Sequence, residues 1–247
     1  MTERDDTEAR IRELLGTATP PEDHAAEPWL EGYGVTSPDV TRYAEVLREV
    51  PDAVVLAMLN VADADESRPT VDPDTAGLIQ HWVYARQPKR VLELGTGVGY
   101  LTTMVARAVP ADCIISTIEV DPERAAAAHA FFEHEPAHCT VELRLGDPLA
   151  MLVDQLVDAW DLVLLSDPSP SRIDALDLIV PRMTPGALLV VPFALLGGRV
   201  ADNVTDWGAD SVVELQRRMN RQVASDPRLC DPLLLPVGDG LLLARRR

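Results

Sequence analysis

The chain has 247 residues, of which 40 are acidic and 22 are lysine or arginine, so its formal net charge is −18. This surplus of negative charge argues against binding to nucleic acid, whose phosphates require clustered basic side chains. Hydrophobic residues make up 47% of the chain, which suits one globular domain. No apolar run reaches the ~18 residues of a membrane-spanning helix.

The N-terminal end and the cysteines predict a cytoplasmic protein. Residues 1–6, MTERDD, are acidic and lack the apolar core of a signal peptide. The three cysteines, Cys113, Cys139 and Cys230, are far apart and odd in number. This usage is typical of buried thiols in a reducing compartment.

The first part of the chain is predicted to be helical. Ile11, Leu14 and Leu15 stand at helical spacing. Ser37 followed by Pro38 is typical of a helix start, with the serine as the N-cap and the proline in the first turn. Helices are expected over 3–16, 38–49, from 51 onward and over 72–85.

From residue 90 the pattern alternates regularly between strands and helices. Strands are expected over 90–94, 113–119, 140–144, 161–166 and 187–192. Helices are expected over 99–108, 122–133, 148–157, 171–182 and 209–225. A final strand pair, about 232–237 and 240–245, is split by Gly238, Asp239 and Gly240, and so short a turn forces an antiparallel hairpin. The prediction is a Rossmann-like α/β fold with a seven-stranded, mostly parallel sheet and helices on both faces.

The most informative segment is 91–100, VLELGTGVGY. An apolar strand runs into a turn with three glycines, the turn opens a helix, and the next strand ends in Glu119. This layout is typical of an adenosine-cofactor site in an open parallel sheet. Glycines let backbone N–H groups approach the ligand, and an acid after the second strand is placed to bind two ribose hydroxyls.

The spacing favours S-adenosylmethionine (SAM) over NAD as the cofactor. The glycines read G-x-G-x-G, with Glu93 two residues before the first. A dinucleotide site must place pyrophosphate on a helix N-terminus, and the charge of Glu93 would repel it. The same charge suits the cationic methionyl end of SAM. The alternative, a glycine-rich turn without a ligand, is disfavoured by the acid at Glu119.

The chain resembles the bacterial SAM-dependent O-methyltransferases that are related to catechol and caffeoyl-CoA O-methyltransferases. The resemblance covers about 70–247 and implies a class I methyltransferase domain there. Its segments are 91–100, 117–123, 197–202 (GGRVAD), 225–228 (SDPR) and 235–240 (LPVGDG). It also implies a homodimer, with residues 1–69 as a helical extension that serves as lid or dimer contact.

The resemblance assigns cofactor roles residue by residue. Gly97 and Gly99 shape the turn, and Tyr100 flanks the methionyl part of SAM. Members of the family usually have a serine after this tyrosine, whereas this chain has Leu101. The remaining implied contacts are Val71, Glu93, Gly95, Thr96 and Glu119, with Gly146, Asp147 and Pro148 near the adenine.

The metal site of the family is not matched. Family members have Asp-Ala-Asp-Lys after the fourth strand and Asp-Asn after the fifth, which hold Mg²⁺ or Ca²⁺. Here Ser166, Asp167, Pro168 and Ser169 follow the fourth strand, and the fifth ends with Pro192 followed by Phe193. Hard cations need several oxygen ligands, so we expect no catalytic metal.

Asp167 is the candidate catalytic residue. It is the only acid at the end of the fourth strand, where ligands bind in open α/β sheets, and it could act as a general base or as a ligand to the substrate. The alternative is an aspartate that caps the following turn. A formal H-E-x-x-H match at 134–138 contains Pro136, which breaks the helix that a zinc site needs, so we interpret it as a chance match.

The predicted function is methyl transfer from SAM to a small-molecule oxygen, with S-adenosylhomocysteine (SAH) as the product. One alternative is a protein-repair methyltransferase for isoaspartyl carboxylates, which the segments 197–202 and 235–240 disfavour. Another is a non-catalytic descendant that binds SAM or SAH. The loss of the metal and lysine positions is the reason to consider it.

Overall fold

The computed structural model describes residues 38–64, 70–134, 137–154, 159–169, 171–202 and 211–247. The helix predicted over 3–16 lies outside these residues. The chain divides into two units, residues 1–51 and 52–247. In the first, α2 (Pro38–Leu47) begins where the sequence predicts it. The second contains the sheet and the remaining helices.

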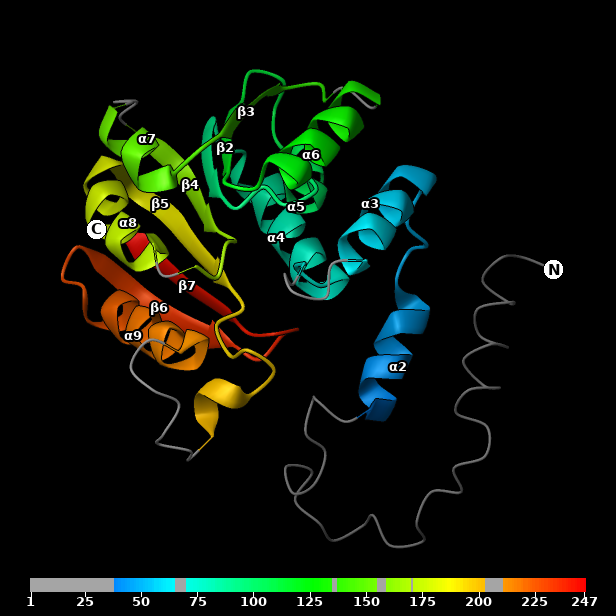
Figure 1. Ribbon diagram of the computed structural model, residues 1–247. Coiled ribbons are helices and arrows are strands. Elements are labelled where there is room, and N and C mark those ends of the chain that lie inside the picture. The colour runs from blue at the N-terminus through cyan, green and yellow to red at the C-terminus, as the bar shows by residue number, and fades with distance from the viewer. Residues whose placement is uncertain (1–37, 65–69, 135–136, 155–158, 170, 203–210) are drawn as a thin grey trace, which may run out of the picture. The chain divides into compact units, whose positions relative to one another are not determined.

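The second unit is built on one seven-stranded sheet (Figure 1). Its strands run in the order β3-β2-β1-β4-β5-β7-β6. The first five are parallel, and β7 is antiparallel to both β5 and β6. The strands are β1 (Arg90–Leu94), β2 (Ile114–Glu119), β3 (Thr140–Leu145), β4 (Trp160–Leu165), β5 (Met183–Pro192), β6 (Leu229–Leu235) and β7 (Leu241–Arg246). This confirms the predicted architecture, although β5 and β6 begin earlier than expected.

Helices cover both faces of the sheet (Figure 1). One face carries α3 (Ala53–Asp63), α4 (Pro73–Arg86), α5 (Tyr100–Ala106) and α6 (Pro122–His134). The other carries α7 (Pro148–Asp154), α8 (Ser171–Ile179) and α9 (Val212–Ser225). Two short 3₁₀ turns, η1 (Val180–Arg182) and η2 (Arg199–Ala201), lie in the connections. No helix in the described ranges is both long and apolar enough to cross a membrane.

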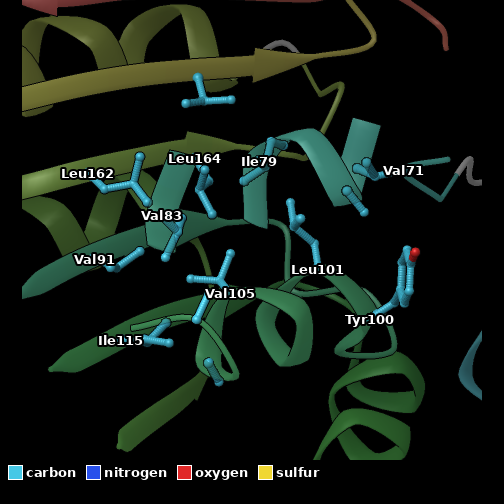
Figure 2. Packing of buried hydrophobic residues seen from close by; sticks show 14 of the residues in the cluster. Val71, Ile79, Val83, Val91, Tyr100, Leu101, Val105, Ile115, Leu162 and Leu164 are labelled. Carbon is cyan, nitrogen blue, oxygen red and sulfur yellow. The ribbon is translucent and has the colours of Figure 1, made fainter. Parts of the chain in front are cut away.

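The hydrophobic core holds the first strands against α4 and α5. Figure 2 shows Ile79 and Val83 of α4 near the strand residues Val91 and Leu164. These side chains are at most 2% exposed, and each large aliphatic side chain contributes roughly 2 kcal/mol when buried. This packing fixes the ends of β1, β2 and β4 next to the start of α5, which is where the predicted site lies.

Candidate functional site

The glycine turn after β1 is pressed against the end of β4. Gly95 has a φ of +93°, and a β-carbon at this position would lie 2.5 Å from the backbone nitrogen of Asp167. The carbonyl oxygen of Leu94 accepts hydrogen bonds from the backbone N–H groups of Ser166 (2.8 Å) and Asp167 (2.9 Å). Only glycine satisfies both the conformation and the close approach.

The carboxylate of Glu119 is held in place by three backbone amides. Oε2 accepts from the N–H of Gly97 at 2.7 Å, and Oε1 accepts from the N–H groups of Val120 and Asp121, both at 3.0 Å. The residue is 4% exposed. Each carboxylate oxygen has two lone pairs, so the oriented group still has acceptor capacity for a ligand hydroxyl.

Glu93 lies behind the turn in a buried hydroxyl cluster. It is 0% exposed, and its Oε2 accepts from the hydroxyls of Thr102 (2.5 Å) and Thr117 (2.8 Å). The Thr117 hydroxyl also bonds to that of Thr96 at 2.6 Å. Oε1 has no partner among the described residues. Burial raises the pKa of Glu93 to about 7, and the nearby carboxylate of Glu119 adds to the rise against the two threonine bonds.

A cavity of about 300 Å³ opens in front of the turn. Gly97, Glu119 and Arg124 line one end, where the Arg124 guanidinium would lie 3.0 Å from a β-carbon placed on Gly97. Asp167 lines the other end, against Gly95. The full lining is Thr70, Val71, Gly95, Thr96, Gly97, Val98, Tyr100, Leu101, Glu119, Val120, Arg124, Ser166, Asp167, Pro168, Ser169 and Phe193.

The structure brings seven of the predicted site residues together in this cavity. They are Val71, Gly95, Thr96, Gly97, Tyr100, Glu119 and Asp167.

The other predicted residues are not part of the cavity lining. Glu93 is behind it, and a β-carbon on Gly99 would lie 2.8 Å from the ring of Phe132. Gly146 donates its N–H to the carbonyl of Glu119 at 2.9 Å. Asp147 accepts from the N–H of Ala150 at 2.8 Å and Pro148 opens α7, so both serve the start of that helix.

Sequence reasoning did not single out Thr70, Val98, Val120, Arg124 or Pro168. Two of them carry a usable signal. Val120 directly follows Glu119, and Arg124 stands in the first turn of the helix that begins at Pro122. The first turn of a helix that follows a strand faces the same sheet edge as the strand end. Inspection of that turn would therefore have found the arginine.

Asp167 serves the turn and lines the cavity as well. Its Oδ1 accepts from the N–H of Ser169 at 3.1 Å, which is an Asx turn. Its Oδ2 accepts no hydrogen bond from the described residues, and the half-buried side chain belongs to the cavity lining.

The ends of β4 and β5 offer a poor donor set for a hard cation. The Ser166 hydroxyl is buried and has no partner among the described residues, and Pro192 and Phe193 offer no side-chain oxygen. No group of three His, Cys, Asp or Glu side chains that could hold a metal occurs in the described ranges. Asp167 is the one carboxylate that these strand ends contribute to the cavity.

The H-E-x-x-H segment does not form one helical face. His134 is the last residue of α6, and Glu135 and Pro136 lie outside the described residues. His138 comes after the helix, and its Nε2 bonds to the carbonyl of Val109 at 2.7 Å. The two histidines therefore do not share a helix.

Comparisons with known proteins agree on one family. A family model described as O-methyltransferase matches residues 50–247. The chain is 27% identical to a catechol O-methyltransferase of Niastella koreensis over 208 residues, which is 81% of this chain and 93% of that protein. It is 31% identical over 196 residues to a putative O-methyltransferase of a Mycobacterium species, covering 79% and 87%. Among solved structures, the O-methyltransferase TomG of Streptomyces achromogenes, which is in complex with SAM, superposes with a TM-score of 0.71 at 25% identity, covering 84% and 95%.

The buried carboxyl group of Glu93 predicts a pH-dependent stability. Its pKa is about 7 in the fold against 4.5 ordinarily, so the folded state holds this proton more tightly than the unfolded state does. The stabilisation is complete below about pH 4.5, declines as the pH rises from 4.5, and is lost once the pH has passed through about 7. The total change is on the order of 3 kcal/mol. Glu93→Gln should remove this slope when urea unfolding is measured from about pH 5 to pH 8.

Glu123→Gln, which changes an exposed glutamate of α6, controls for the loss of one negative charge. Equal slopes for the wild-type protein and Glu93→Gln would contradict the prediction.

Proposed function

The chain belongs to the O-methyltransferase family, and from this premise we propose that its cavity binds SAM and methylates a hydroxyl oxygen of a small molecule without a catalytic metal. The observation that carries the cofactor assignment is Glu119, whose carboxylate is fixed at the cavity by three backbone amides. The complexed state of TomG and the 31% identity to a putative O-methyltransferase support it.

The residues of the cavity fit the two halves of this cofactor. Glu119 would accept hydrogen bonds from the ribose hydroxyls, and Val120 and Arg124 would lie at the adenosine half. The end near Gly95 would then hold the methionyl half, where the Ser166 hydroxyl leaves a buried polar atom for a ligand group. SAM supplies an activated methyl group on a cationic sulfur.

The other residues would orient the acceptor and take its proton. The cavity also has apolar walls, which would exclude water and align the acceptor. They are formed by Val71, Tyr100, Leu101 and Phe193. Asp167 Oδ2, which the turn leaves without a bond among the described residues, would accept the proton of the acceptor hydroxyl. Because a single carboxylate holds Mg²⁺ poorly, we infer that no metal takes part.

Three further expectations stay predictions. They are the homodimer, the role of residues 1–69 as lid or dimer contact, and the cytoplasmic location.

Glu119→Gln tests the cofactor assignment. An amide presents an N–H₂ group where the carboxylate only accepts, so the SAH affinity measured by calorimetry should fall about tenfold or more. Glu123→Gln, an exposed change one residue into α6, should bind SAH like the wild-type protein. Unchanged SAH binding by Glu119→Gln would argue that the ribose is bound elsewhere.

Transfer of labelled methyl groups tests the reaction. In buffer with EDTA, we expect methylation of the phenolic oxygen of 4-nitrophenol, whose hydroxyl is partly ionised at neutral pH, and none of an isoaspartyl peptide. Asp167→Asn should lower kcat for a phenol that must lose its proton by about 10²-fold or more. Methylation of the isoaspartyl peptide would refute the proposed hydroxyl acceptor. An unimpaired Asp167→Asn enzyme would refute the proposed role of Asp167 as the base.

A further inference from the structure

A buried arginine lies in the turn that carries Asp167, at the Gly95 end of the cavity. Arg172 belongs to the first turn of α8 and is 3% exposed. Buried arginines are normally paired with a carboxylate, because an isolated buried charge is costly. Among the described residues no ion pair involves Arg172, and the carboxylate whose charge acts on it is that of Asp167.

The turn between β4 and α8 connects Arg172 to Asp167. The guanidinium Nη1 donates to the carbonyl of Leu165 at 3.3 Å, two residues before Asp167. The backbone N–H of Arg172 donates to the carbonyl of Ser169 at 3.4 Å. The N–H of Ser169 in turn donates to Asp167 Oδ1 at 3.1 Å. The two charged residues therefore stand at opposite ends of one hydrogen-bonded turn.

The carboxylate of Asp167 affects the pKa of Arg172. Burial lowers the pKa of Arg172 to about 10, and the carboxylate of Asp167 acts in the opposite direction. The guanidinium thus remains cationic at neutral pH. Asp167 lines the cavity and Arg172 does not. A ligand in the cavity therefore touches the carboxylate but not the guanidinium, and it experiences the sum of their two electric fields.

We propose that Arg172 is a positioning residue that acts through Asp167, offsetting the carboxylate charge at the Gly95 end of the cavity. The inference rests on the proposed function, in which this end holds the sulfonium. Positive charge on that sulfur declines as the methyl group leaves. An uncompensated carboxylate would therefore stabilise bound SAM more than the transition state, which slows the reaction. Arg172 limits that ground-state stabilisation while leaving Asp167 Oδ2 available as a proton acceptor.

A comparison of two ligands isolates this charge effect. SAM carries the sulfonium charge and SAH does not, so the ratio of their dissociation constants reports the field near the sulfur. In calorimetry, Arg172→Met should bind SAM about three- to tenfold more tightly, as expected for an unscreened charge in a partly buried site. SAH affinity should stay within about twofold. Arg172→Lys should restore the wild-type ratio.

Two further variants complete the experiment. Arg182→Met removes another arginine whose guanidinium donates to a backbone carbonyl, that of Leu178, and should leave both affinities unchanged. Asp167→Asn should weaken SAM about threefold or more relative to SAH, and it keeps the proposal testable if Arg172→Met does not fold.

A purely structural role for Arg172 predicts a different pattern. Damage to the turn would weaken SAM and SAH together, and that result would overturn the proposal. A wild-type ratio in either Arg172→Met or Asp167→Asn would overturn it as well. Failure of the wild-type protein to bind SAH would instead reject the proposed function itself, and this inference with it.

Discussion

The contact between Gly95 and the backbone of Asp167 determines the geometry of the whole site. The Leu94 carbonyl binds the N–H groups of both Ser166 and Asp167, so the end of β4 lies directly on the glycine turn. A β-carbon at residue 95 would push the two apart. Because the turn also positions the Gly97 amide on Glu119, one close approach sets both the Gly97 end and the Gly95 end of the cavity.

Charge is organised differently at the two ends. At the Gly97 end, Glu119 is oriented by amides and has a cation, Arg124, beside it in the cavity lining. At the Gly95 end, Asp167 faces the cavity and Arg172 lies buried beneath the turn. Fixed charges of this kind are already in place before a reaction, so no reorganisation is needed to respond to charge moving on a bound ligand.

The parts of the site that depend on local backbone were predictable from sequence. The position of glycines in a strand-to-helix turn, and of an acid at the end of the next strand, follows from the local sequence alone. Gly95, Gly97 and Glu119 do line the cavity. The environment of Glu93 was not readable, because it depends on threonines from α5 and β2 that meet only in the fold. Arg172 was missed for the same reason: nothing in the sequence marks an arginine as buried.

We propose that this chain binds SAM in the cavity beside Glu119 and does not use the catalytic metal that its ligand-poor strand ends would have to hold. Titration of Mg²⁺ into the SAH-saturated protein by calorimetry tests it most directly. We expect micromolar binding of SAH and then no saturable heat from Mg²⁺ at submillimolar concentrations, since one carboxylate is too few ligands. Stoichiometric, micromolar Mg²⁺ binding that depends on SAH would contradict it.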